Sequence, residues 1–277
     1  MKKISRRSFM AAAAVSVAAL ALTACGGSAS SAASSVASSA ASSEAVSSSA
    51  AELTTVEAGK LTMATNAAFP PYEMTTDAGE FEGIDVDTAK AIAEKLGLEL
   101  QIDDMDFDAA LLSVQQGKAD IVMAGVTVTD ERKAVMDFSD SYATGIQSII
   151  VPNDSDIASP DDLAGKKIGT QRGTTGYIYC SDDFGDSNVV AYDNGLTAVQ
   201  ALNNGQVDAV VIDNAPAQEF VAANPGLKVL DTSYAEEDYA IGMAKGSALE
   251  DAVNKALEEL KADGTLQAIV DKYINAN

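Results

Sequence analysis

From residue 60 onward, short apolar runs alternate with longer segments in which apolar residues recur every three or four positions. The short runs are typical of strands and the longer segments of helices with one apolar face. The pattern predicts strands at 61–65, 98–102, 120–124, 167–170, 189–192 and 208–212. It predicts helices at 86–96, 107–116, 196–203, 215–223, 248–261 and 266–274. This alternation indicates an α/β fold in which helices cover parallel sheets.

An internal echo indicates two lobes of similar design. In the segments LLSVQQGKADIVMAG (111–125) and AVQALNNGQVDAVVID (198–213), a helix end is followed by Gly-x-x-Asp and then an apolar strand, so that Gly117 and Asp120 match Gly205 and Asp208. In open α/β sheets, ligands bind at the carboxyl ends of the strands. We therefore expect the site among the loops that follow these strands.

The first 24 residues read as an export signal, because a basic start is followed by the apolar run 9–22. The sequence Leu-Thr-Ala-Cys-Gly at 22–26 resembles the lipobox of bacterial lipoproteins. That resemblance implies cleavage before Cys25 and lipid on Cys25; the alternative is a secretory signal with an incidental cysteine. The pair Arg6-Arg7 resembles a twin-arginine signal, which leaves the export route open.

A tether is predicted to follow the signal. Of the 24 residues at 28–51, 21 are Ser or Ala, too little apolar bulk to form a core. We assign 25–57 to the lipidated cysteine and a flexible linker, so that a globular part hangs from the cell membrane outside the cytoplasm.

Composition excludes several kinds of protein. The chain has no histidine, which rules out Ser-His-Asp catalysis and histidine-ligated metals. Its net charge of −23 disfavours nucleic acid as a partner. Glycine-rich nucleotide motifs are absent, and the acidic run 103–108 lacks the Gly and Glu of a calcium loop, so no cofactor and no metal are expected. With Cys25 lipidated, Cys180 has no partner for a disulfide, and we expect it to be buried.

The segment 124–142 (AGVTVTDERKAVMDFSDSY) holds the most informative charge. Thr129 is placed to cap a short helix, which puts Arg132 in its first turn, where a cation costs about 0.3–1 kcal/mol. Arg132 is therefore suited to a bidentate grip on a carboxylate. The alternative is a surface ion pair with Asp130 or Asp137.

Two later segments offer further polar groups. In 165–179, Thr174 and Thr175 follow a strand and a glycine. Free backbone N–H groups at this position can bind an anion. The alternative is that threonine caps the next helix. In 207–217, Asp213 follows a strand and either caps the next helix or accepts an ammonium group.

A fourth segment, 64–74, presents Asn66 and Phe69 on a loop stiffened by two prolines. Phe69 is either part of the core or a wall for an apolar ligand stem. The four segments together suit a zwitterionic α-amino acid.

These segments resemble the solute-binding proteins of polar amino acid ABC importers, bacterial extracellular family 3, over 60–274. The most specific match is GVTVTDERKAVMDFSDSY at 125–142. The resemblance implies a type II periplasmic-binding-protein fold: two lobes, each a mostly parallel sheet flanked by helices, joined by two hinge strands near 146–152 and 237–243. Lobe 1 would comprise 58–148 plus 240–277, and lobe 2 would comprise 149–239.

The resemblance also implies a function and roles for particular residues. The protein would be a monomer that captures a polar amino acid and delivers it to a membrane permease. A dehydratase-like enzyme on the same fold and a ligand-sensing receptor module are the alternatives.

The residues that the resemblance assigns to the ligand fall into three groups. The α-carboxylate would be held by Gly125, Thr127 and Arg132, helped by Thr174 and Thr175. Asp213 would take the α-ammonium group. The ligand side chain would lie among Asn66, Phe69, Phe107 and Gln171.

The neutral amides of Asn66 and Gln171 favour a ligand such as glutamine. Glu73 would favour a cation if it reached the pocket, although its place after Pro-Pro-Tyr looks structural.

Overall fold

The computed structural model describes residues 53–274, and its first sheet forms lobe 1. The strand order is β5-β1-β6-β14-β7. The central strand β1 runs parallel to β5 and β6, whereas β14 is antiparallel to β6 and β7. The strands are β1 (Lys60–Thr65), β5 (Glu99–Asp104), β6 (Ile121–Val122), β7 (Met136–Phe138) and β14 (Gly242–Ala244).

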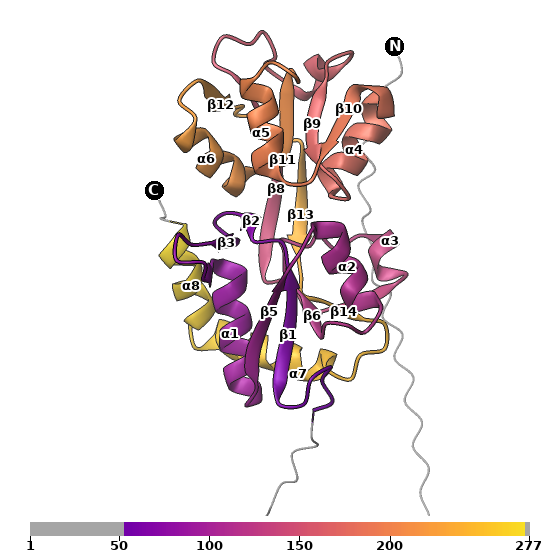
Figure 1. The fold of residues 1–277 in the computed structure, drawn as a ribbon, viewed down its shortest axis with the longest axis vertical. Coiled ribbons are helices and arrows are strands. Elements are labelled where there is room, and N and C mark those ends of the chain that lie inside the picture. The colour runs from indigo at the N-terminus through magenta and orange to yellow at the C-terminus, as the bar shows by residue number, and fades with distance from the viewer. Residues whose placement is uncertain (1–52, 275–277) are drawn as a thin grey trace, which may run out of the picture. The chain divides into compact units, whose positions relative to one another are not determined.

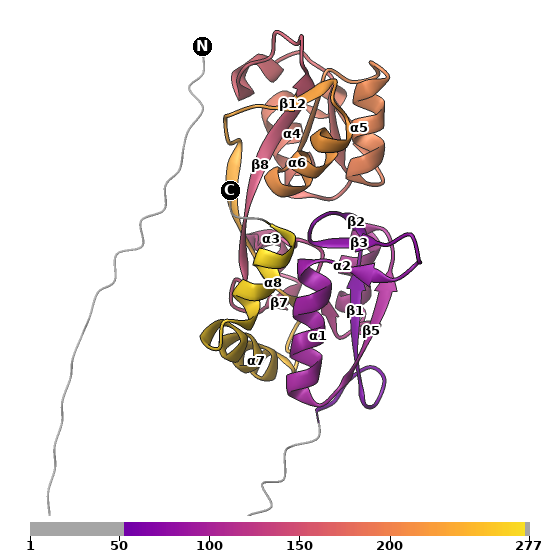
Figure 2. The ribbon, with the colours of Figure 1, turned by 90° about the vertical axis from the view of Figure 1, so that its left-hand side faces the viewer.

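Helices pack on both faces of this sheet because side chains alternate along β1. Leu61 and Met63 share a buried cluster with α1, while Ala64 shares another with α2. Two C-terminal helices pack against α1 (Figure 2). The helices of lobe 1 are α1 (Ile84–Leu96), α2 (Phe107–Gln115), α3 (Asp130–Lys133), α7 (Glu250–Ala262) and α8 (Thr265–Tyr273).

Lobe 2 is built around a six-stranded sheet in the order β10-β9-β11-β8-β12, with β13 paired to β8. Its first three strands are parallel, and β8 is antiparallel to its neighbours. The strands are β8 (Ala143–Pro152), β9 (Ile168–Gln171), β10 (Val189–Tyr192), β11 (Ala209–Asp213), β12 (Leu227–Val229) and β13 (Ala235–Tyr239). The helices are α4 (Thr175–Phe184), α5 (Gly195–Asn203), α6 (Asn214–Ala223) and the 3₁₀ turns η1 (Pro160–Leu163) and η2 (Asp186–Asn188).

Two strands run between the lobes. β8 and β13 pair antiparallel over five residues, from Ala143↔Tyr239 to Gln147↔Ala235, and they join the two sheets in Figure 1. The two-lobed α/β architecture with two hinge strands is thus confirmed. The lobe limits at 148/149 and 239/240 remain predictions.

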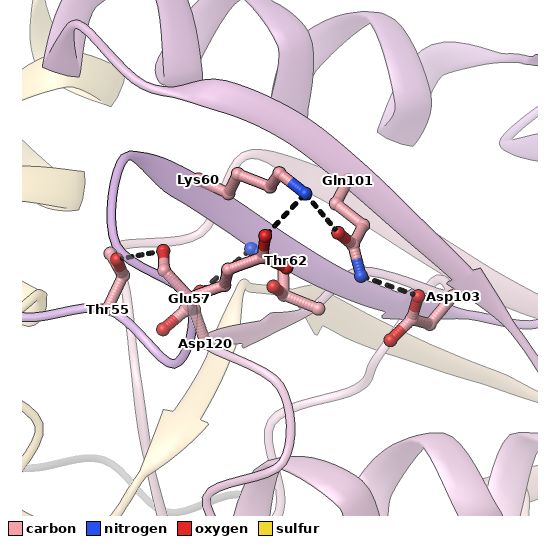
Figure 3. Close-up of polar contacts among 7 residues, drawn as sticks. All are labelled: Thr55, Glu57, Lys60, Thr62, Gln101, Asp103 and Asp120. Carbon is pink, nitrogen blue, oxygen red and sulfur yellow. Dashed lines mark hydrogen bonds and ion pairs between the residues drawn. The ribbon is translucent and has the colours of Figure 1, made fainter.

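The repeated Gly-x-x-Asp motif has the same structural role in both lobes. In lobe 1, Asp120 Oδ2 accepts from Thr62 N at 2.8 Å, and Asp120 N donates to Thr62 O at 2.9 Å (Figure 3). In lobe 2, Asp208 Oδ2 and N bind Lys167 N and O, each at 2.8 Å. Each aspartate therefore fixes the start of the strand beside it.

Asp120 makes one contact that Asp208 does not. Its second oxygen accepts from Val56 N at 2.8 Å, which ties the entering chain to the sheet. Figure 3 shows Lys60 nearby, paired with Glu57 at 2.6 Å and donating to Gln101 at 3.2 Å.

Several expectations need adjustment. The strand expected over 120–124 has only two ladder residues in β6, because the chain then turns into the loop that carries Gly125. The small sheet of β2 (Ala68–Phe69), β3 (Glu73–Thr75) and β4 (Phe81–Glu82) was not predicted. Cys180 is fully buried, as expected. The predicted signal, Cys25 and most of the predicted linker lie outside the described residues. None of the described helices is both long and apolar enough to cross a membrane.

Candidate functional site

A pocket between the lobes gathers all ten residues expected at the ligand site. Two further residues, Glu73 and Ala124, complete its lining. The ten are Asn66, Phe69, Phe107, Gly125, Thr127, Arg132, Gln171, Thr174, Thr175 and Asp213. The enclosed volume is about 20 Å³, roughly the space that one water molecule needs. Admitting a larger molecule therefore requires the side chains or the lobes to move.

The sheets explain how residues so distant in sequence meet. Asn66 directly follows β1, Gly125 follows β6, Gln171 ends β9, and Asp213 ends β11. The carboxyl ends of parallel strands lie at one edge of a sheet, and the two sheets turn these edges toward the same pocket.

Arg132 is a buried cation held in a fixed orientation. Thr129 caps α3 as predicted, accepting from Arg132 N at 3.2 Å. The side chain is 9% exposed, and its Nη1 and Nη2 donate to Thr127 O at 2.8 Å and to Gly173 O at 3.2 Å. These contacts engage two of five N–H groups, so others remain for an anion. Its carbon Cζ lies 5.3 Å from the ring centre of Phe107.

The alternative of a surface ion pair for Arg132 does not hold among the described residues. Asp137 pairs with Lys245 at 2.6 Å instead. Burial lowers the pKa of the Arg132 guanidinium, and the nearby Glu237 carboxylate opposes that shift.

Asp213 faces the same pocket from lobe 2. It stands at the N-cap position of α6, but its side chain makes no capping hydrogen bond. Instead, its Oδ1 accepts from the hydroxyl of Tyr239. Burial raises the pKa of the Asp213 carboxyl to about 7, with Glu237 adding to the shift and the Tyr239 hydrogen bond opposing it. A buried carboxyl of this kind is suited to an ammonium group, which supplies the missing positive charge.

The threonines of the pocket are tied to a carboxylate that sequence reasoning did not assign to the site. Glu237 on β13 accepts at one oxygen from Thr127 Oγ1 (3.2 Å), Thr175 Oγ1 (2.9 Å) and Gln147 Nε2 (2.9 Å). This single oxygen thus links lobe 1, lobe 2 and both hinge strands. Thr174 has a different role, capping α4 by accepting from Tyr177 N at 3.3 Å.

One wall of the pocket is aromatic and another carries amides. Phe69 is buried and stacks on Tyr72 with ring centres 6.0 Å apart. Gly125 (φ 55°) is needed here, because a Cβ at this position would lie 2.9 Å from the Phe69 ring. Gln171 Nε2 donates to Asn66 Oδ1 at 3.0 Å across the two lobes, and Asn66 Nδ2 donates to Met105 O at 2.8 Å.

Glu73 is the pocket residue whose two side-chain oxygens both lack a hydrogen-bond partner among the described residues. Its side chain is fully buried, and no described residue donates a hydrogen bond from nitrogen or hydroxyl to either oxygen. Burial and the neighbouring Asp85 carboxylate raise the pKa of Glu73 well above its ordinary value. The Pro-Pro-Tyr-Glu context favoured a structural role and left a place in the pocket open; Glu73 does line the pocket.

No group of three His, Cys, Asp or Glu side chains within 53–274 is arranged to hold a metal ion. The pocket offers one guanidinium, two carboxyl groups, two amides and two aromatic rings. This set fits binding of a small zwitterion.

Comparison with known proteins identifies the family. Residues 61–276 match the model of the bacterial extracellular solute-binding proteins, family 3. The chain belongs to this family.

Relatives of this solute-binding protein cover between 78% and 95% of its length. A probable histidine-binding protein of Neisseria gonorrhoeae is 34% identical over 271 residues, 95% of this chain and 94% of its own length. An ancestral arginine-binding protein has been solved with glutamine and with arginine. Both structures are 43% identical and superpose with a TM-score of 0.75, covering 78% of this chain and 98% and 99% of their own.

The matches confirm the type II periplasmic-binding-protein fold. Proteins of this family bind solutes outside the cytoplasm rather than transforming them.

Proposed function

We propose that this protein captures one amino acid between its two lobes and delivers it to an ABC importer. The observation that carries the proposal is the pairing of Arg132 and Asp213 in one buried pocket. A guanidinium matches the α-carboxylate of an amino acid, and a buried carboxylate matches its α-ammonium group.

The other predicted residues have supporting roles in this proposal. The loop of Gly125 and Thr127 and the start of α4 at Thr174 and Thr175 flank the carboxylate. Phe69 and Phe107 line the part of the pocket that would hold the ligand side chain, as aromatic rings often do.

The choice of ligand depends on which polar groups remain to be satisfied. The amides of Asn66 and Gln171 favoured glutamine, but Asn66 already contacts Gln171 and Met105. Glu73 has no such partner among the described residues. We therefore favour a cationic amino acid such as arginine and keep glutamine as the second candidate. The ancestral relative solved with glutamine and with arginine supports keeping both candidates.

Anchoring and assembly are part of the same proposal. The lipobox-like segment around Cys25 would fix the chain to the outer face of the cell membrane, and the linker would let the lobes reach a permease. The protein would act as a monomer, as the family resemblance implies.

Calorimetric titration tests the proposal. The protein is refolded from denaturant to remove carried-over ligand and is titrated with each of the twenty amino acids. Tight binding of arginine or another cationic amino acid supports it, and binding of glutamine alone supports the second candidate. If none of the twenty amino acids gives a binding signal, amino acid capture is contradicted. The next step is then to assay turnover of small carboxylates.

A further inference from the structure

Glu73 lies in an acidic surrounding that its ordinary ionised form does not fit. The groups that face it from neighbouring elements are Asp85 on α1, Asp104 on β5 and Asp213 at the end of β11. The hydroxyls of Tyr72 and Tyr142 lie close as well. Arg132 is the one cation among the residues that line the pocket, and it is fixed on two carbonyls.

Asp85 determines which of the two neighbouring acids carries the negative charge. Its oxygens accept from Gly125 N at 3.0 Å and from the Tyr142 hydroxyl at 2.7 Å. Hydrogen bonds of this kind stabilise the ionised form, whereas Glu73 receives none from the described nitrogens and hydroxyls. Of the two carboxyl groups, Glu73 is therefore the one that keeps a proton more readily.

We propose that Glu73 exchanges this proton for the cationic side chain of the ligand, so that arginine binds with release of a proton and its neutral isostere does not. This inference rests on the proposed function, because Glu73 lines the same pocket. In the exchange, the Glu73 O–H bond breaks, the electron pair stays on the carboxylate, and the proton passes to the buffer.

The magnitudes favour the exchange. A positive charge within about 4–6 Å lowers the pKa of a carboxyl by about 1–3 units. Burial of an unpaired guanidinium is unfavourable, and a facing carboxylate offsets that penalty. The consequence is a preference for cations that strengthens as pH rises, by up to about tenfold in Kd per pH unit for one proton released.

Asp213 adds a second, separable proton. Its pKa of about 7 means that any α-ammonium group displaces part of a proton near neutrality. This contribution is common to all amino acids. Comparing arginine with citrulline, which replaces the guanidinium by a neutral group of the same shape, cancels it.

The experiment is calorimetry of the protein at pH 7 in buffers of different ionisation enthalpy. The dependence of the observed heat on that enthalpy gives the number of protons released. We expect arginine to release more protons than citrulline, by a difference of up to about one. The variant Glu73→Gln should remove the difference and weaken arginine more than citrulline. The control Glu82→Gln, on β4 and outside the pocket, should keep it.

Equal proton numbers for arginine and citrulline in the unmodified protein overturn the inference while leaving amino acid capture standing. The same holds if neutral amino acids bind and arginine does not. If no amino acid binds, the proposed function itself fails and the inference fails with it. Neither test depends on whether the Glu73 variant folds.

Discussion

At the residue scale, the two charges of the pocket are held in contrasting ways. Arg132 is fixed by backbone carbonyls of both lobes, so its position reports whether the lobes are together. Asp213 is fixed by a hydroxyl from the hinge strand β13. A ligand that binds Arg132 of lobe 1 and Asp213 of lobe 2 would therefore bridge the two lobes. It would contact side chains whose positions depend on groups outside their own lobe.

Replacing Arg132 should abolish the grip on the carboxylate. For Arg132→Ala we expect ligand binding to weaken by about 2–5 kcal/mol, which is about thirtyfold or more, because the ligand carboxylate loses a buried partner. Arg132→Lys should fall between this variant and the parent, since it keeps the charge without the forked geometry. Calorimetry measures the affinities. Binding by the alanine variant at parental strength would show that the carboxylate lies elsewhere.

The Asp213 carboxyl makes affinity depend on pH. An ammonium group favours its ionised form, so the pKa of Asp213 should fall below about 7 in the complex. The affinity is then greatest above pH 7. It weakens as pH falls, with Kd rising by up to about tenfold per pH unit. Citrulline titrations between pH 5 and 8 isolate this effect. Asp213→Asn should bind weakly with a flat profile, and an unchanged profile would remove Asp213 from the site.

Local sequence predicted some residues of the site better than others. Arg132, Thr129 and Asp213 stand out because their positions after strands or within a first turn are visible within a few residues. Glu237 does not, because its contacts with Thr127 and Thr175 lie 110 and 62 residues away. Only the folded hinge brings these groups together.

At the element scale, helices and parallel strands followed from periodicity, whereas several antiparallel strands did not. The short strands β2, β3, β4 and β14 have two or three residues each, too few for a two-residue period to appear. Their pairing depends on chain segments far away in sequence, as with β14 against β6.

The packing of the hinge strands requires glycine at position 145. A Cβ on Gly145 would lie 2.4 Å from the buried Tyr239 ring, which in turn positions Asp213. We expect Gly145→Ala to lower the unfolding free energy by about 1–3 kcal/mol through overpacking and to weaken ligand binding.

The matched control is Gly226→Ala, where a Cβ meets nothing within 4 Å. Denaturant unfolding and calorimetry are applied to both variants. Equal behaviour of the two would refute the role of the Gly145 contact.

The repeated aspartates make another prediction at this scale. Asp120 is buried and accepts from two backbone N–H groups, whereas Asp208 is exposed and accepts from one. Hydrogen bonds to charged groups contribute about 1.5–3 kcal/mol each, and less when exposed. Asp120→Ala should therefore lower the thermal midpoint more than Asp208→Ala does. A larger effect from Asp208 would contradict this reading of the repeat.

At the scale of the whole molecule, binding should couple the two lobes. A ligand at a hundred times its Kd adds about 2.7 kcal/mol to the unfolding free energy. Because the pocket takes residues from both lobes, we expect amide exchange to slow in the loop after β6 and at the start of α4 together. Protection confined to one lobe would show that the ligand does not bridge them.

The negative net charge of the whole chain favours a cationic ligand, as Glu73 in the pocket does. A net charge of −23 attracts cations and repels anions over distances of about 8 Å at physiological salt. A cationic ligand is therefore favoured both during its approach and once it lies beside Glu73.

Both ends of the described chain belong to lobe 1, since β1 opens the first sheet and α8 packs against α1. Lobe 2 is thus an excursion from the middle of the sequence. When the hinge moves, neither end need travel with lobe 2, and a membrane attachment upstream of Leu53 would stay still. A fluorophore at either end of the described chain would move with lobe 1 and would not report closure. A reporter of ligand capture must therefore be placed inside lobe 2.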